Sequence, residues 1–352
     1  MTQIDKTKPV LVTGANGFVA SWLVKKLLEE GITVHAAVRN PENPKKVGHL
    51  KELGKQAKGE IKFFKADLLT PGAYKEAMQG CELVYHTASP FTTNVKDPQK
   101  ELIDPALNGT ENVLESANET ESVKRVVVTS SCAAIYTDAI DSVNAPGGVL
   151  TEEIWNSTAS LDHQPYSYSK TLAEKKAWEM ANAQNRWDLI AINMSFVLGP
   201  ALSPGASSSE SMNILKMMGD GQMKMGAPNL GIGMVDVRDV AEAHYRGGFT
   251  PEAKGRYITS AHNTNMVELA EQLIPKYGDL YPVPKKAMPK WLLMILGPLM
   301  NKAMTRKYLR NNINVPWKAD NSKIKNDLKM EFLPKRKTME DSFQMLIDEK
   351  MI

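Results

Sequence analysis

An α/β fold with a parallel sheet and a smaller helical lobe is what the 352-residue sequence predicts, and three observations support it. An apolar run at residues 10–13 enters a glycine turn that opens an amphipathic helix. Strand and helix patterns alternate down to about residue 195, and helical patterns dominate from about residue 266 onward. Such alternation is typical of a doubly wound, Rossmann-type parallel sheet, whose ligand crevice lies at the carboxyl ends of the strands.

Composition and charge narrow the class of protein. The chain is 42% apolar with a net charge of +3, which indicates neither nucleic acid nor an acidic membrane surface as a partner. Cys81 and Cys132 are the only cysteines, and no metal-ligand spacing occurs. Residues 1–9 are polar, unlike a signal peptide, and the most apolar stretch, 291–300, is too short to span a bilayer. We expect a soluble, cytoplasmic protein without a metal, present as a monomer or a homodimer.

The glycine turn after the first strand has the form of a dinucleotide phosphate site. Gly14 permits a tight turn, and Gly17 lets the backbone approach a pyrophosphate held at the N-terminus of the helix expected at 21–30. Ala20 takes the place of the usual third glycine and is small enough for close packing of helix on strand. A glycine turn without a ligand is the alternative.

The end of the second strand, at residues 33–38, indicates which dinucleotide would bind. Val38 occupies the position where an NAD site carries an acidic residue for the ribose, and Arg39 follows it. With Lys45 and Lys46 close behind, a positive cluster would flank a 2′-phosphate. The pattern therefore favours NADP(H) over NAD(H), and a solvated strand-end charge is the alternative for Arg39.

Further strands are expected at 61–65, 83–86 and 125–129, with helices at about 43–54 and 101–118. Asp67 follows the third strand, where it either accepts from an adenine amino group or caps the segment from Pro71. The turn 87–90 and the pair Ser130-Ser131 follow the next two strands. In a parallel sheet, all of these strand ends meet at one edge, together with Gly14 and Arg39.

Tyr166 and Lys170 lie four residues apart at the start of a helical pattern, which places both side chains on one face. An ammonium beside a phenol favours the phenolate and makes the hydroxyl a better proton donor and acceptor near neutral pH. A serine from 130–131 would then hold a substrate carbonyl beside the phenol. A packed ring and a solvated charge are the alternative. His163, in a loop expected at 138–164, is interpreted as a surface or capping residue rather than a second acid.

The rest of the chain supplies a further strand at 189–194 and a Ser/Gly/Pro-rich loop at 203–211. Asp236 and Asp239, at the junction of a short strand and a helix, are expected to cap the helix or to bridge to other groups. A late strand is expected at 256–260. We expect residues 1–195 to form the NADP(H)-binding domain, to which a helix and a strand at about 234–262 return. Segments 196–233 and 263–352 would then form a substrate-binding lobe that closes over the crevice.

Taken together, several motifs make the chain resemble the extended or atypical short-chain dehydrogenase/reductases, in the branch of the dihydroflavonol 4-reductase-like enzymes. The resemblance covers nearly the whole chain and rests on Val12–Ala20, Val38–Pro41, Ala66–Leu68, His86–Pro90, Val128–Ser131, Tyr166–Glu174 and Val197–Pro200. It implies a Ser-Tyr-Lys site of Ser131, Tyr166 and Lys170, with Ser130 as runner-up to Ser131. Tyr166 would donate the proton, and Lys170 would hold the nicotinamide ribose and lower the tyrosine pKa.

The resemblance also implies the residues that contact NADP(H). They are Thr13, Gly14, Asn16, Gly17, Phe18, Val19, Arg39, Lys46, Asp67, Leu68, Thr87, Ala88, Ser89, Thr129, Ser130, Tyr166 and Lys170. Asn108 matches a helix asparagine that supports a proton relay in related enzymes, with a plain helix-interior amide as the alternative.

The sequence departs from this branch where the substrate would bind. Asn193-Met194 replaces the common Asn-Pro or Arg-Pro, Tyr136 replaces an asparagine of dihydroflavonol reductases, and residues 163–168 lack the cinnamoyl-CoA reductase signature. We therefore expect reduction of a small to medium, largely apolar aldehyde or ketone. The alternatives are 3β-hydroxysteroid or sugar-nucleotide chemistry on the same triad, and an NADP(H)-sensing regulator without turnover.

Overall fold

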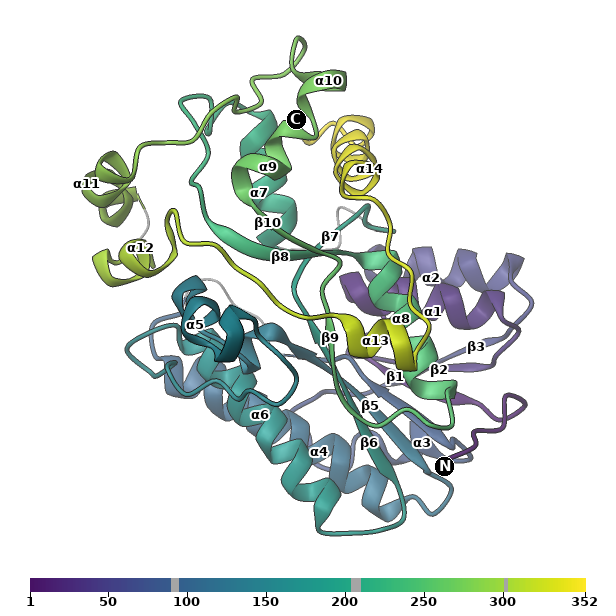
Figure 1. Ribbon diagram of the computed structural model, residues 1–352. Helices are drawn as coiled ribbons and strands as arrows, with labels where there is room; N and C mark the ends of the chain where they lie inside the picture. The colour runs from purple at the N-terminus through teal and green to yellow at the C-terminus, as the bar shows by residue number, and fades with distance from the viewer. Residues whose placement is uncertain (90–94, 204–209, 301–302) are drawn as a thin grey trace.

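A computed structural model describes residues 1–89, 95–203, 210–300 and 303–352 (Figure 1). Its centre is a seven-stranded sheet in the order β3-β2-β1-β4-β5-β6-β9, and every neighbouring pair is parallel. The strand order reverses between β1 and β4, which is the switch point where such sheets bind ligands. The strands are β1 Val10–Thr13, β2 Val34–Val38, β3 Ile61–Lys65, β4 Leu83–His86, β5 Arg125–Ser131, β6 Asp188–Met194 and β9 Gly255–Thr259.

Helices cover both faces of this sheet because its strands are apolar on both sides. Val10 and Val12 of β1 lie in one apolar cluster with residues of α1, α2 and α8, whereas Leu11 lies in a second cluster with residues of α3, α4 and α6. The first set of helices is α1 Phe18–Glu29, α2 Pro44–Gln56 and α8 Val237–Phe249, and the second is α3 Lys75–Met78, α4 Asp104–Glu119 and α6 Pro165–Asn182. A five-residue π-helix, Gln99–Ile103, leads into α4.

A second, three-stranded sheet lies above the central sheet in Figure 1. Its middle strand, β8 Gly231–Asp236, pairs in parallel with β7 Phe196–Leu198 and antiparallel with β10 His262–Asn265. An apolar cluster joins it to α7 Glu210–Gly219, α9 Met266–Glu271 and α14 Lys335–Asp348. The remaining helices are α5 Ala139–Asn144, α10 Ile274–Tyr277, α11 Lys290–Met300, α12 Arg306–Asn312 and α13 Ser322–Asp327.

The predicted fold class is confirmed, and several local features differ from the predictions or were not predicted. Helix α1 begins at Phe18, three residues before the expected start at residue 21. Strand β5 runs through Ser131, because both serines pair with β6. Helix α5 lies within the expected loop 138–164, where Asp138 and Asp141 form a capping box. Strand β10 is polar in sequence and owes its place to pairing with β8. Helix α7 begins at Glu210, inside the loop expected at 203–211, whose residues 204–209 lie outside the described chain.

The division into a domain and a lobe stays a prediction. The late strand expected at 256–260 is β9 of the central sheet, and α8 packs against α1. Asp236 caps α8 by accepting from the backbone N–H of Arg238, as the sequence indicated. Asp239 accepts from the backbone N–H of Leu333 instead, so it bridges α8 to the C-terminal segment.

Candidate active site

The glycine turn and the end of β4 are held against each other at the switch point. Gly14 has φ +60°, and a Cβ at this position would lie 3.0 Å from the Cα of Ala88. The buried hydroxyl of Thr13 accepts hydrogen bonds from the backbone N–H groups of Thr87 and Ala88, at 3.1 and 3.0 Å, and Thr87 donates to the Thr13 carbonyl. Gly17 is exposed and forms the N-cap of α1. The predicted phosphate site therefore has an open helix N-terminus beside a tightly fixed turn.

Phe18, at the start of α1, faces the second sheet. Phe18 packs against the apolar cluster of β7, β8 and α7. Four residues further along α1, the Trp22 indole donates to the carbonyl of Pro200 at 2.8 Å. Asn16 and Val19 are half-buried. The start of α1 therefore lies at the junction between the central sheet and the smaller sheet.

Two cations follow the second strand as the sequence predicted. Arg39 is exposed at the end of β2, and Lys46 is exposed in the first turn of α2, whose N-cap Asn43 accepts from the N–H of Lys45. At the neighbouring strand end, Asp67 accepts from the N–H of Leu69 at 2.9 Å. Asp67 therefore caps a local turn rather than the segment from Pro71. The exposed guanidinium and ammonium groups are suited to a 2′-phosphate.

Leu68 forms part of a pocket at the carboxyl edge of the sheet. A Cβ at Gly109 would lie 2.6 Å from the Leu68 side chain, and Asn112 donates to the Leu68 carbonyl, so α4 packs closely on this residue. The pocket brings together predicted residues from four separate segments of the chain. Its lining includes Leu68, His86, Ala88, Ser89, Ala106, Thr110, Thr129, Ser130, Lys170 and Glu174.

The side chains of the three predicted catalytic residues lie together beside this pocket. Ser131 makes a side-chain hydrogen bond with Tyr166, and its hydroxyl also accepts from the N–H of Ala133 at 3.1 Å. The ammonium of Lys170 lies 5.8 Å from the centre of the Tyr166 ring and donates to the Ser89 hydroxyl at 2.8 Å. Helix α6 is therefore tied to the end of β4, and a phenol, a hydroxyl and an ammonium meet at the strand ends.

Burial changes the acidity of both helix residues. It raises the pKa of Tyr166 above its usual value, and the hydrogen bond with Ser131 opposes this rise. Burial also lowers the pKa of Lys170 to about 8, against the charge of Glu174. Burial of the phenol outweighs the hydrogen bond with Ser131, so the pKa of Tyr166 is raised overall. The expectation that the Lys170 ammonium favours the phenolate stays a prediction.

The two adjacent serines point to different partners. Ser130 is buried and donates to the carboxylate of Glu174, whereas Ser131 faces Tyr166. Successive side chains of a strand alternate between its two faces, so only one of the pair can reach the phenol. The geometry favours Ser131 over Ser130 as the serine beside the reacting atoms.

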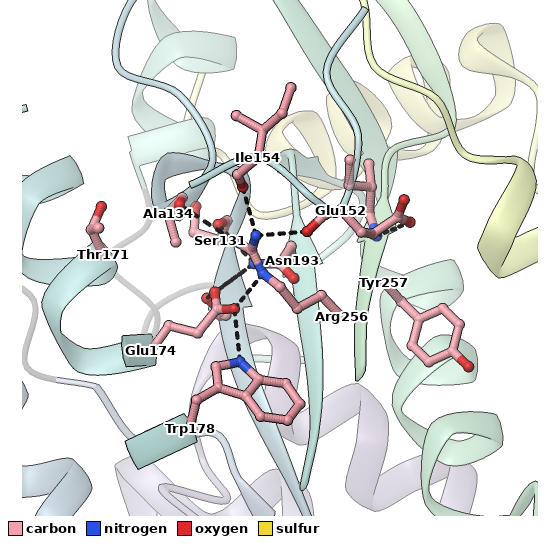
Figure 2. Close-up of polar contacts among 12 residues, drawn as sticks. Ser131, Ala134, Glu152, Ile154, Thr171, Glu174, Trp178, Asn193, Arg256 and Tyr257 are labelled. Atoms are coloured by element: carbon pink, nitrogen blue, oxygen red, sulfur yellow. Dashed lines mark hydrogen bonds and ion pairs between the residues drawn. The ribbon is translucent and has the colours of Figure 1, made fainter. Parts of the chain in front are cut away.

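Glu174 is the centre of a buried polar network that the sequence did not reveal (Figure 2). Its carboxylate accepts from Arg256 and from Asn193, both at 2.6 Å, as well as from Ser130. Trp178, one turn along α6, donates to it at 3.3 Å. Buried ion pairs are costly unless their remaining hydrogen bonds are satisfied, and here several partners share the charge.

Arg256 completes this network from β9. Its guanidinium donates to the carbonyls of Glu152 and Ile154, at 2.8 and 2.6 Å, and stacks 4.0 Å from the centre of the Trp155 ring. The network therefore fixes α6 to β5, β6 and β9 at Glu174, one helical turn along α6 from Lys170. Its one signal in the sequence is an arginine within an otherwise apolar strand pattern.

Three other residues singled out in the sequence have side-chain environments away from the Tyr166 hydroxyl. The Thr129 hydroxyl lies 2.7 Å from the Nε2 of buried His244 on α8, so its hydroxyl is directed away from the phenol. Asn108 is exposed on α4 and is not among the residues that line the pocket, and its part in a proton relay stays a prediction. His163 is buried rather than on the surface, with its Nε2 2.7 Å from Asp138, which also accepts from Asn312 of α12.

The match to a known family covers most of this architecture. Residues 10–254 match the model of the NAD dependent epimerase/dehydratase family. The chain belongs to this family. Within it, the sequence is 44% identical over 272 residues to cinnamoyl-CoA reductase CAD2 of Medicago truncatula, which covers 76% of this chain and 81% of that protein. It is also 40% identical over 292 residues to a putative anthocyanidin reductase of Ginkgo biloba, over 80% of this chain and 83% of that protein.

Solved structures of reductases resemble nearly the whole chain. The crystal structure of yeast methylglyoxal/isovaleraldehyde reductase Gre2 complexed with NADPH has a TM-score of 0.78 and 27% identity, and it covers 98% of this chain and 100% of its own. The predicted resemblance to the dihydroflavonol reductase-like branch and the predicted oxidoreductase class are therefore confirmed. The predicted cofactor, NADP(H), is the one that the Gre2 complex holds.

The predictions about the location and the partners of this protein are tested only in part. Across the described residues, each helix is too short or too polar to cross a membrane. The cytoplasmic location and the state of monomer or homodimer stay predictions, as do the individual contacts to NADP(H).

Proposed function

We propose that this chain reduces aldehydes or ketones to alcohols with NADPH, in a reversible reaction. The observation that carries the proposal is the arrangement of Ser131, Tyr166 and Lys170 at the carboxyl edge of the sheet, beside the glycine turn. The chain's membership of the NAD dependent epimerase/dehydratase family and its similarity to named reductases support carbonyl reduction as well.

The residues at the switch point fit NADPH. The positive φ of Gly14 and its close approach to Ala88 leave no room for a side chain, which keeps the turn open to a pyrophosphate. Arg39 and Lys46 would hold the 2′-phosphate, while Leu68 and Ala88 would contact the adenosine half. When bound, NADPH supplies the hydride that the carbonyl carbon accepts.

Tyr166 supplies the proton in this scheme. As hydride reaches the carbonyl carbon, the substrate oxygen gains electron density and takes the proton of the Tyr166 hydroxyl, while Ser131 donates a hydrogen bond to the same oxygen. The alcohol forms, and a phenolate is left on Tyr166. The nearby Lys170 ammonium stabilises that phenolate, which lowers the barrier relative to a lone tyrosine.

Aromatic side chains beside Ser131 support an apolar substrate. Cys132, the next residue, lies in an apolar cluster with Ile135 and Trp317, and the ring of Tyr136 lies 5.5 Å from that of Trp317. Burial raises the pKa of Tyr136, so its hydroxyl stays neutral. Tyr136 is the partly exposed aromatic residue of this otherwise buried cluster, and an aldehyde or ketone with a hydrocarbon body would gain from burial against it.

The test measures NADPH consumption as the loss of absorbance at about 340 nm. The substrates are a panel of aliphatic and aromatic aldehydes, ketones and diketones. NADH, sterols and nucleotide sugars run beside the panel. Reduction of apolar carbonyls, with the alcohol identified as product, supports the proposal. Tight NADPH binding with no turnover on any carbonyl would contradict it and favour a sensor.

A further inference from the structure

Helix α11 is apolar on almost every side, yet it lies at the edge of the molecule. Of its eleven residues, only Lys290 is charged, and the other ten are Trp291-Leu-Leu-Met-Ile-Leu-Gly-Pro-Leu-Met300. Helices of this kind are normally buried in a core or in a membrane. In Figure 1, α11 and α12 project together from the side of the smaller lobe.

Only one face of α11 is covered. Leu293 is buried in a small cluster with Leu309 and Ile313 of the α12 region, and a Cβ at Gly297 would lie 3.0 Å from Leu309. The opposite face carries an exposed stripe of Trp291, Ile295 and Leu299, which are 66%, 59% and 82% exposed. These three residues follow one another at intervals of four, so they form a continuous line along the helix. We call this set the α11 stripe.

The segment that carries the stripe is strongly basic. Residues 280–319 contain eight lysines and arginines and no aspartate or glutamate, so the rest of this +3 chain is net negative. Six of these cations have exposed side chains, and none of the six makes an ion pair with another residue of the described ranges. They are Lys285, Lys286, Arg306, Lys307, Arg310 and Lys318.

The charge of the segment distinguishes between two possible binding partners of the α11 stripe, a second copy of the chain and a lipid bilayer. A second copy of the chain, docked symmetrically, would bring the same cations face to face, because such an interface uses the same patch twice. An anionic bilayer instead offers negative headgroups to the cations and acyl chains to the stripe. Tryptophan is also a preferred side chain at the boundary between headgroups and acyl chains.

We propose that α11 and α12 bind the surface of an anionic lipid bilayer, with the α11 stripe inserted at the headgroup boundary and the flanking cations against the headgroups. Eleven helical residues span roughly 16 Å, which is about half of a hydrocarbon core, so α11 lies in the interface rather than crossing it. This association is separate from carbonyl reduction and would localise the enzyme next to lipid-soluble substrates.

Sedimentation with lipid vesicles tests the proposal on the full chain without substrate. We expect binding to vesicles that contain phosphatidylserine, little binding to pure phosphatidylcholine, and release by high salt. The triple variant Trp291→Ser/Ile295→Ser/Leu299→Ser should lower binding at least about tenfold. Arg306→Glu/Lys307→Glu/Arg310→Glu should lower it by a larger factor, since each cation near the surface is worth roughly fivefold.

Matched variants control for exposure and net charge. Leu69→Ser/Val143→Ser/Leu161→Ser removes three exposed apolar residues elsewhere, and Lys8→Glu/Lys58→Glu/Lys62→Glu reverses three distant exposed cations. Both should bind vesicles within about twofold of the parent chain. Absence of vesicle binding, or equal loss in the control variants, would overturn the proposal. Concentration-dependent dimers that the stripe variant abolishes, without vesicle binding, would assign the stripe to a second copy instead.

Discussion

Ser130 donates its hydroxyl hydrogen to the buried carboxylate of Glu174, although the neighbouring Ser131 faces Tyr166. The two serines are adjacent in β5, yet one belongs to the network under α6 and the other to the candidate catalytic set. This division of roles leads to opposite expectations for their removal.

Ser131→Ala should lower kcat/KM by about a hundredfold with little change in thermal stability, because a hydrogen bond to the developing oxyanion is lost. Ser130→Ala should instead destabilise the fold by ~1–3 kcal/mol, because Glu174 loses a buried donor. Measurements of Tm and of kcat per folded molecule separate the effect on stability from the effect on catalysis. Equal loss of kcat in both variants would contradict the assignment of roles.

The pH dependence of the reaction should report Lys170. Burial lowers the pKa of Lys170 to about 8, and burial raises the pKa of Tyr166, so the first group to lose its proton on the basic side is the ammonium. We expect kcat for carbonyl reduction to fall as the pH rises through about 8.

Glu174→Gln should move that basic limb to lower pH. The carboxylate of Glu174 favours the charged ammonium, so its removal lowers the pKa of Lys170 further. Glu179→Gln, at an exposed carboxylate on the same helix, is the control and should leave the limb in place. A basic limb that stays unchanged in Glu174→Gln, in folded enzyme, would show that Glu174 acts only on stability.

Cofactor preference should depend on the two exposed cations after β2. Arg39→Ala and Lys46→Ala should each raise the KM for NADPH roughly 10- to 100-fold while changing the KM for NADH little, since a charge-assisted contact to a 2′-phosphate is lost. Lys55→Ala, at the far end of α2, serves as the control. Equal use of NADH and NADPH by the parent chain would remove the basis for this prediction.

Gly14→Ala should weaken both the fold and NADPH binding. The residue has φ +60°, and the new methyl group would press on Ala88 at 3.0 Å, so a loss of ~1–2 kcal/mol is expected. Gly48→Ala offers a matched comparison, because a Cβ there would contact nothing within 4 Å and α2 would gain helix propensity. Denaturant unfolding and NADPH titration measure both effects, and an unaffected NADPH Kd in Gly14→Ala would contradict the phosphate site.

Local sequence patterns predict the fold class and predict that the candidate residues meet at one edge of the sheet. The spacing of Tyr166 and Lys170 predicts that they share one helix face. The order of strands along the chain predicts that Gly14 and Ser131 lie at the same edge. The pairing of Glu174 with Arg256 was not predictable, because 82 residues separate them and only the path of β9 brings them together.

Other features that the sequence does not specify have equally local causes. The motif around Asn108 does not specify its exposure, and the structure places the residue at the solvent-exposed surface of α4. The direction of the tyrosine pKa depends on burial, which the sequence does not specify. The net charge of the whole chain does not reveal the basic segment 280–319, because the remaining residues are net negative and offset its charge.

The most direct test of the central claim compares Tyr166→Phe with Tyr168→Phe in NADPH-dependent reduction of the best carbonyl substrate. Tyr168 lies on the same helix and is also half-buried, so it controls for the loss of a tyrosine hydroxyl. We predict that Tyr166→Phe lowers kcat by about 10²- to 10⁴-fold with NADPH binding retained, and that Tyr168→Phe changes it less than about threefold. Undiminished turnover in Tyr166→Phe would contradict the proposed role of Tyr166 as the proton donor.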